Sequence, residues 1–97
     1  MTPGVDIESI RHKALRRFVE TGNTKGVIEP ARLARILEFL AKARSIDECY
    51  VPPNFGFHPL TGDRAGEFAI TVTRNWRLTF NRVDEQTIAD LDLEDYH

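Results

Sequence analysis

The sequence lacks most of the features that mark secreted, membrane-bound or metal-dependent proteins. Its single cysteine, Cys49, cannot form an internal disulfide, which favours a reducing, cytoplasmic setting. No apolar run approaches the roughly 20 residues that span a bilayer, and residues 1–6 do not resemble a secretory signal, so we expect no membrane association. One cysteine and three histidines without a compact ligand spacing predict no metal site. A glycine-rich phosphate loop and a G-x-S-x-G serine are missing too, so we expect no cofactor.

Length and composition are those of a small globular protein. The 97 residues predict one domain over residues 1–97, large enough for a core without disulfides. The net charge of −2 conceals an asymmetry, since residues 1–45 hold nine Lys or Arg against five Asp or Glu, and residues 46–97 hold four against ten. A basic half favours a polyanion or an acidic partner, although basic residues more often form the solvated faces of helices. The acidic total argues against non-specific coating of nucleic acid.

Hydrophobic spacing predicts a strand and two helices in the first half of the chain. Residues 5–10 alternate between apolar and polar, which is typical of a short strand. Residues 12–20 follow the helical period, and Gly22 is placed to end that helix. A second helix begins at Pro30, which suits a first helical turn, and ends near Arg44. The stripes expected to face the core are Leu15, Phe18 and Val19 in the first helix and Leu33, Ile36, Leu37 and Leu40 in the second.

The second half predicts four short strands. Alternating segments occupy residues 55–58, 68–72, 76–80 and 89–93. Short turns join antiparallel neighbours, so these strands are expected to form a meander. We therefore predict an α+β fold, a small twisted antiparallel sheet in the order β-α-α-β-β-β-β with two N-terminal helices packed on one face.

The candidate acid–base groups are the histidines, because only histidine titrates near neutral pH without perturbation. His12 opens the first helix among basic residues and is expected at the surface. His58 follows two phenylalanines in one strand and is expected to point to the face opposite them. His97 is the last residue and also carries the α-carboxylate.

Two arginines and a tryptophan complete the set of candidates. Arg64 lies at the far end of the hairpin connection that begins at the second histidine. Arg77 lies in mid-strand and faces away from its apolar neighbours, which calls for an anionic ligand or for a cross-strand pair with Asp90 or Asp92; both alternatives stay open. Trp76 is more often a core residue than a platform on which bases stack.

These groups suit the cleavage of RNA by its own 2′-hydroxyl, which needs neither a metal nor an external nucleophile. The reaction needs a base near the hydroxyl and an acid near the leaving 5′-oxygen, and histidine can serve as either. It also needs cations for the charge that grows on the phosphorane, and arginine can hold two phosphate oxygens at once. An aromatic ring can stack on an unpaired base.

Several motifs in one order resemble HigB-type toxins of the RelE/ParE superfamily. The resemblance runs from about Ile7 to His97 in one register without a large gap, and the combination of separate motifs makes it specific. The motifs are Arg11-His12-Lys13-Ala14-Leu15-Arg16-Arg17-Phe18, Glu20-Thr21-Gly22, Lys25-Gly26, His58-Pro59-Leu60, Gly62-Asp63-Arg64, Asn75-Trp76-Arg77 and Asp92-Leu93-Glu94-Asp95-Tyr96-His97.

The resemblance implies a toxin of a type II toxin–antitoxin system. It implies a ribosome-dependent, metal-independent mRNA endonuclease that inhibits translation, with mRNA in the ribosomal A site as its substrate. It implies a HigA-like helix-turn-helix antitoxin as the neutralising partner, with operator DNA bound only through the antitoxin complex. By position, the catalytic residues of the family fall on His58, Asp95, Tyr96 and His97. RNA- or phosphate-binding positions fall on Arg64 and Arg77, with Trp76 beside them as the candidate stacking ring.

Two alternatives to this function stay open. The ParE branch of the superfamily shares the fold but inhibits DNA gyrase without cutting RNA, and it does not need the terminal Tyr96-His97. The other alternative is a weakened toxin that acts mainly as an antitoxin-binding corepressor. Family members commonly carry Lys where this chain has Thr61, and loss of that cation removes a phosphate contact. The excess of acidic residues in the chain also favours a weakened toxin.

Overall fold

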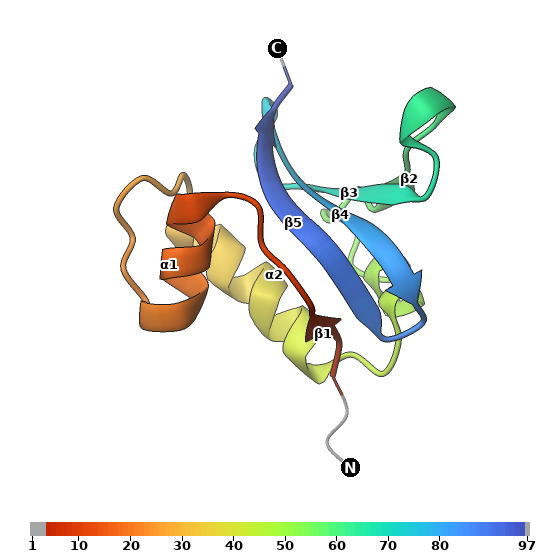
Figure 1. The fold of residues 1–97 in the computed structure, drawn as a ribbon, viewed down its shortest axis with the longest axis horizontal. Helices are drawn as coiled ribbons and strands as arrows, with labels where there is room; N and C mark the ends of the chain where they lie inside the picture. The colour runs from red at the N-terminus through yellow and green to blue at the C-terminus, as the bar shows by residue number, and fades with distance from the viewer. Residues whose placement is uncertain (1–3, 97) are drawn as a thin grey trace.

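The computed structural model describes residues 4–96, which form two α-helices on one side of a five-stranded sheet (Figure 1). The elements in chain order are β1 (Asp6–Ile7), α1 (Lys13–Thr21), α2 (Pro30–Lys42), the 3-10 helix η1 (Ile46–Tyr50), β2 (His58–Pro59), the 3-10 helix η2 (Gly62–Arg64), β3 (Glu67–Thr71), β4 (Trp76–Asp84) and β5 (Thr87–Asp95). This arrangement confirms the predicted α+β fold. No helix in the described part of the chain is long and apolar enough to cross a membrane.

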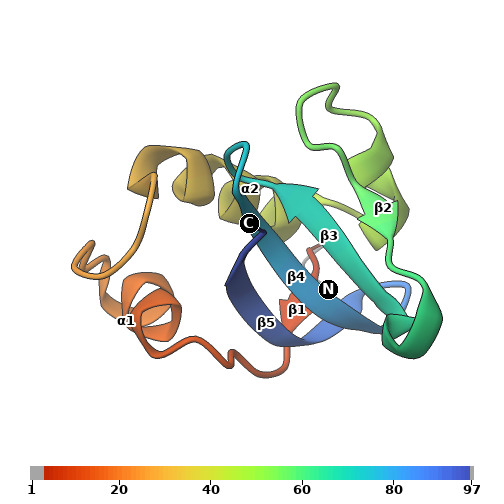
Figure 2. The ribbon, with the colours of Figure 1, turned by 90° about the horizontal axis from the view of Figure 1, so that it is seen from above.

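The strand order of the sheet is β1-β5-β4-β3-β2 (Figure 2). The last four strands pair with their neighbours in antiparallel fashion, which confirms the predicted meander. The first strand differs from the prediction, because β1 pairs with β5 in parallel and makes the sheet mixed. The two helices and their connections separate β1 from the meander, so short turns do not dictate the direction of this pair.

The predicted strand over residues 5–10 pairs at its two ends but not in its middle. Ile7 pairs with Ile88 and Ile10 with Leu91, in the same register. Between them β5 carries a bulge, where Asp90 adopts a positive φ of 54° and its N–H donates to the Ser9 hydroxyl instead of to a strand carbonyl. The alternating pattern was therefore correct, and the bulge in the partner strand breaks the ladder.

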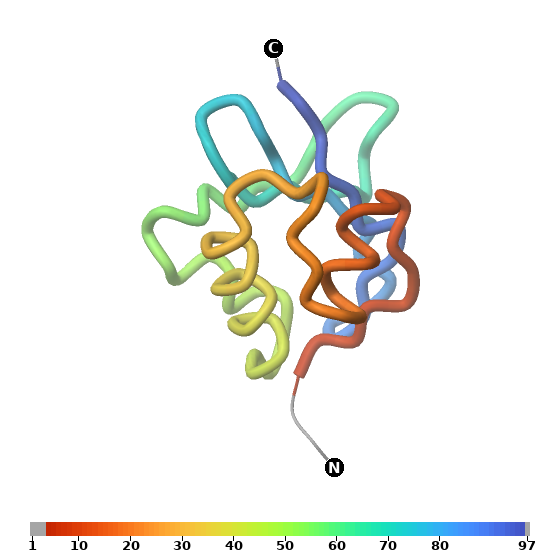
Figure 3. The backbone as a smooth tube through the Cα atoms, turned by 90° about the vertical axis from the view of Figure 1, so that its left-hand side faces the viewer, coloured from red at the N-terminus to blue at the C-terminus, as the bar shows by residue number. Residues whose placement is uncertain are grey.

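The helices confirm their predicted starts and stops within two residues. The first lies between two local caps: the ring nitrogen of His12 accepts the N–H of Leu15, and Gly22 adopts φ 80°. The second begins at Pro30 and ends at Lys42. Figure 3, seen from the helical side, shows both helices in front of the sheet.

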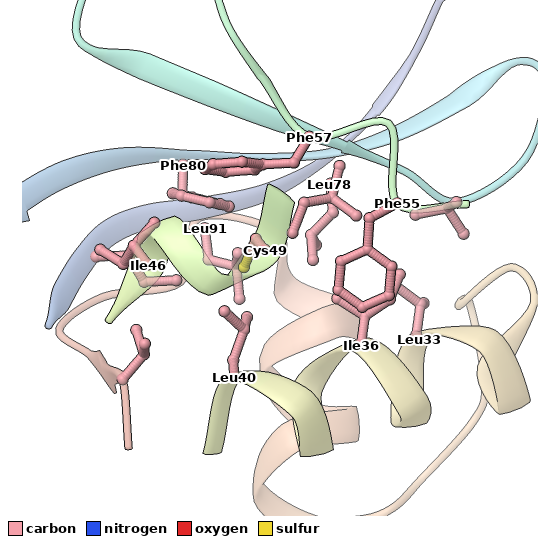
Figure 4. Close-up of a cluster of buried hydrophobic side chains, with 14 of the residues drawn as sticks. Leu33, Ile36, Leu40, Ile46, Cys49, Phe55, Phe57, Leu78, Phe80 and Leu91 are labelled. Atoms are coloured by element: carbon pink, nitrogen blue, oxygen red, sulfur yellow. The ribbon is translucent and has the colours of Figure 1, made fainter. Parts of the chain in front are cut away.

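The hydrophobic core fills the space between the helices and one face of the sheet. Buried side chains of α2 point toward Leu78, Phe80 and Leu91 of the sheet, and η1 closes one side of the cluster with Ile46 and Cys49 (Figure 4). Most of the predicted core residues belong to this cluster, whereas Val19 is 40% exposed at the outer edge of the helix stripe. The core thus covers one face of the sheet, and the helices do not cover the opposite face.

Candidate active site

The side chains that point away from the helices form a polar surface on the sheet, which we call the open face. Register defines it, since residues that pair across neighbouring strands point to the same side. One row runs from His58 through Ala69 and Thr79 to Asp92, and the next from Thr71 through Arg77 to Glu94. The open face therefore collects most of the predicted site residues.

His58 lies on the edge strand β2 with its imidazole exposed on the open face. Its Nδ1 lies 2.8 Å from the carbonyl oxygen of Gly56, so Nδ1 carries the proton and donates it to that carbonyl. In this tautomer Nε2 has a free lone pair and can accept a proton from a substrate. Gly56, at φ 54°, turns the chain so that Phe57 enters the core while His58 stays outside. The prediction that the histidine and the phenylalanine point to opposite faces is confirmed, although the strand is only two residues long.

Arg64 lies over the open face with both edges of its guanidinium occupied. Glu67 accepts from Nε at 3.2 Å and from one terminal nitrogen at 2.8 Å. Glu94 accepts from both terminal nitrogens, at 2.9 Å and 2.6 Å. Both hydrogen-bonded carboxylates raise the pKa of the Arg64 guanidinium, and the hydrogen bond from Arg64 is the main cause that lowers the pKa of the Glu94 carboxyl. Arg64 and Glu94 therefore hold each other in their charged forms.

Glu94 is a site residue that sequence reasoning missed. The hydroxyl of Thr79, a residue only 1% exposed, also donates to its carboxylate. Strand alternation could have placed Glu94 beside Arg77 on the open face. It could not have revealed the arginine that reaches Glu94 from a loop 30 residues earlier in the sequence.

Arg77 uses its guanidinium differently from Arg64. One terminal nitrogen donates to the carbonyl oxygen of Thr73 at 2.7 Å and also to two neighbouring carbonyls of the β3–β4 turn. The guanidinium carbon lies 5.4 Å from the centre of the Tyr96 ring, in a cation–π arrangement. The alternative of a cross-strand pair with Asp90 or Asp92 is not seen within residues 4–96. Arg77 pairs in register with Glu94, Asp92 with Thr79, and Asp90 accepts from Asn81 at 2.9 Å.

The predicted residues at the C-terminal end divide between the two faces of the sheet. Trp76 pairs with Asp95 and packs against the hydrophobic core, so it lies on the face opposite Arg77. The N–H of Tyr96 donates to the carbonyl of Asn75 at 2.5 Å, which extends the β4–β5 ladder. His97 lies outside the described residues.

His58 and Tyr96 belong to opposite sides of the meander. Strands β2 and β5 are three strand spacings apart, or about 14 Å across the sheet. Tyr96 also lies four residues beyond Asp92, which occupies the row of His58. A reaction that uses both groups must therefore place its substrate across the open face, over the Arg64–Glu94 pair.

Other features of the described residues lie away from the open face. Residues 4–96 hold no group of three His, Cys, Asp or Glu side chains that could bind a metal ion. Cys49 is fully buried, and burial raises the pKa of its thiol to about 11, so it is a packing residue. A hollow of about 400 Å³ between α2 and η1 lies on the helical side and is lined by Arg35, Glu38, Phe39, Lys42, Ala43 and Glu48.

Comparison with known proteins places the chain in a family. A family model for the "RelE-like toxin of type II toxin-antitoxin system HigB" matches residues 8–97. The chain belongs to the HigB-like toxin family. Within that family it is 39% identical to a Proteus vulgaris protein named Endoribonuclease HigB, over 95 residues that cover 94% of this chain and 99% of that protein. The predicted resemblance to HigB-type toxins is thus confirmed.

Solved structures share the fold of this HigB-like toxin at low sequence identity. YafQ from E. coli strain BL21(DE3) aligns with a TM-score of 0.61 at 17% identity, covering 94% of this chain and 92% of that one. A chain of the E. coli DinJ–YafQ toxin–antitoxin complex aligns with a TM-score of 0.57 at 18% identity, covering 90% and 89%. At these identities the likeness is one of fold.

Proposed function

We propose that this HigB-like toxin is an endoribonuclease that cuts ribosome-bound mRNA without a metal and so inhibits translation. The relative that is 39% identical carries the name Endoribonuclease HigB. The observation that carries the proposal is the exposed imidazole of His58, whose Nδ1 is bound to the Gly56 carbonyl and whose Nε2 is free to take a proton. Membership of the wider RelE/ParE superfamily alone would fit a toxin of either the RNA-cutting or the gyrase-binding kind.

The proposed reaction is attack of a ribose 2′-hydroxyl on the neighbouring phosphorus. A base removes the hydroxyl proton, the O2′–P bond forms, the P–O5′ bond breaks, and an acid gives a proton to the leaving 5′-oxygen. The products are a 2′,3′-cyclic phosphate and a 5′-hydroxyl. His58 supplies one proton-transfer group, and the segment Asp95, Tyr96 and His97 supplies the other.

We assign to Arg77 the stabilisation of the negative charge that develops on the phosphorane. Within residues 4–96 the partners of Arg77 are backbone carbonyls and the Tyr96 ring, with no carboxylate among them, so its positive charge stays available to an anion. The Trp76 ring, predicted to stack on a base, packs instead at the border of the core. Tyr96, 38% exposed beside Arg77, is better placed for such a contact.

The proposed partners are an antitoxin and the ribosome. A type II toxin is neutralised by a cognate antitoxin, and the DinJ–YafQ structure is described as a toxin–antitoxin complex. We propose a HigA-like helix-turn-helix antitoxin, operator DNA contacted only through the complex, and a cytoplasmic site of action on mRNA in the ribosomal A site.

The test is cleavage of a defined mRNA by the purified chain, with and without bacterial ribosomes. We expect cuts only in the ribosome-bound message, ending in a 2′,3′-cyclic phosphate, and unaffected by a chelator. His58→Ala should lower the cleavage rate at least about a hundredfold. Val51→Ala, at a position 77% exposed at the end of η1, is the control and should cut like wild type.

Other outcomes would identify the alternative functions. Intact ribosome-bound mRNA together with inhibition of gyrase supercoiling would replace the proposal with a ParE-like poison. Weak cleavage together with tight antitoxin binding would indicate the corepressor. The presence of Thr61, where family members commonly carry Lys, favours that alternative.

A further inference from the structure

The C-terminal end of β5 has a strand neighbour on one side only. Pairing with β4 continues as far as Asp95, whereas β1 accompanies β5 only to the bridge at Leu91. Within residues 4–96, the last residues of β5 are thus bound to a single strand, and Figure 1 shows this end leading to the C-terminus. Because the catalytic segment begins here, its position depends on side chains as well as on the ladder.

Glu94 supplies side-chain contacts of this kind. It is the last residue before the proposed catalytic segment, and its carboxylate accepts two hydrogen bonds from Arg64 and one from the hydroxyl of Thr79. The carboxylate is 26% exposed and the Arg64 side chain 35%, so water covers only part of the pair. Charge-assisted, bidentate bonds of this kind are the most directional that side chains form.

Arg64 connects Glu94 to the segment that carries His58. It belongs to η2, in the connection that leaves β2 directly after His58 and Pro59. Glu67, on β3, holds the other edge of the same guanidinium. The Arg64–Glu94 pair therefore joins the two halves of the open face, one with His58 and one with the C-terminal segment, across strands β3 and β4.

This arrangement does not suit Arg64 as a phosphate ligand. Four of the five N–H donors of its guanidinium are used by the two carboxylates. One arginine between two glutamates leaves a local charge of −1, which repels a phosphate. A phosphate could reach Arg64 only by displacing a carboxylate from a bidentate pair.

We propose that Arg64 and Glu94 are positioning residues, whose ion pair fixes the C-terminal segment Asp95-Tyr96 at a set distance from His58. The reaction that they serve is the RNA cleavage proposed above, on which this assignment depends. Neither side chain transfers a proton or binds the reacting phosphate. Their effect is on the geometry of the groups that do.

The activity test measures the maximal cleavage rate and the ribosome concentration at half-maximal rate for Glu94→Gln and Arg64→Gln. A positioning role predicts that each variant lowers the maximal rate between about ten- and a hundredfold, while the half-maximal concentration stays within about twofold. The double variant should be no slower than the slower single variant, because both remove the same pair. Arg64→Lys, which keeps the charge but loses the fork, should recover only part of the rate.

Glu85→Gln is the matched control, since it removes the same charge from an exposed position in the β4–β5 turn. It should behave like wild type. If Glu94→Gln cuts as fast as wild type or faster, while Arg64→Gln raises the half-maximal concentration, Arg64 is a phosphate ligand and the proposal is overturned.

A second measurement does not depend on catalysis. The Tyr96 amide, bonded to the Asn75 carbonyl, should exchange its hydrogen at least about tenfold faster in Glu94→Gln than in Glu85→Gln, a larger increase than that of the amides of the core strands. Equal Tyr96 exchange in both variants would overturn the positioning role. If wild type does not cut RNA but the Tyr96 amide responds as expected, the proposed function fails and the structural role of the pair stands.

Discussion

Arg64 and Arg77 have the same side chain, and their surroundings give them different roles. Arg64 is held between two carboxylates, whereas Arg77 donates to turn carbonyls and stacks on Tyr96. The sequence predicted both as phosphate ligands, because residue type indicates what a side chain can bind. Residue type does not indicate which partner the fold brings to that side chain. Glu94, the partner of Arg64, is 30 residues away in the sequence.

Thr61 offers a direct test of phosphate affinity at the scale of one residue. It is exposed and precedes η2, and its side chain makes no capping hydrogen bond. We expect Thr61→Lys to restore a cation near the open face and to strengthen binding to ribosome-bound mRNA about two- to tenfold at low salt, with the gain shrinking as salt is raised. Sedimentation with ribosomes and growth after induction would measure it. Thr61→Gln, which adds length without charge, is the control, and an equal gain there would contradict the prediction.

Cys49 should be chemically inert in the folded protein. Its side chain points from η1 into the core and is fully buried, and burial raises the pKa of the thiol to about 11, so almost no thiolate is present at pH 8. We expect no reaction with iodoacetamide in native buffer and complete alkylation in guanidinium chloride, both measured by mass spectrometry. Rapid alkylation of the native chain would show that the 3-10 helix opens readily.

The elements that the sequence predicted best are those whose signals are local. Both helices, with Pro30 at one start and Gly22 at one end, depend on residues within a turn of each other. Strands β1 and β2 are much shorter than predicted, because a bulge at Asp90 in the partner strand and a positive φ at Gly56 interrupt them. Neither interruption changes the alternating pattern from which strands are predicted.

His12 is the clearest case of a residue whose role belongs to its element. It was one of three candidate acid–base groups, and its ring nitrogen caps α1 by accepting the Leu15 amide at 3.1 Å. We expect His12→Ala to lower the free energy of unfolding by about 1 kcal/mol, and His12→Asn to lose only a few tenths, because asparagine caps equally well. Urea unfolding measures both. Lys13→Ala, at the exposed next position, should cost less than His12→Ala; the reverse order would argue against the cap.

At the scale of the whole molecule, the two faces of the sheet have different roles. The helices cover one face of the sheet and carry most of the excess positive charge, and the other face collects acids around the half-buried guanidinium of Arg64. The sequence predicted this two-layer division from hydrophobic periodicity. It could not predict the open-face network, because the register between β3, β4 and β5 and the path of η2 together determine which charges meet.

That network makes the stability of the fold dependent on pH. The Arg64 hydrogen bond holds the pKa of Glu94 below its usual value of 4.5, so the pair contributes its full stability above that value and loses it as pH falls through the lowered pKa. At pH 7 Glu94→Gln should therefore unfold about 1 kcal/mol more easily than wild type, and the difference should shrink as the pH is lowered from 7 to well below 4.5. Calorimetry at intervals between these pH values measures it, with Glu85→Gln as the control for charge alone. A difference that stays constant with pH would mean that Glu94 stabilises the sheet by packing and the Thr79 bond, and that the cross-sheet ion pair adds nothing.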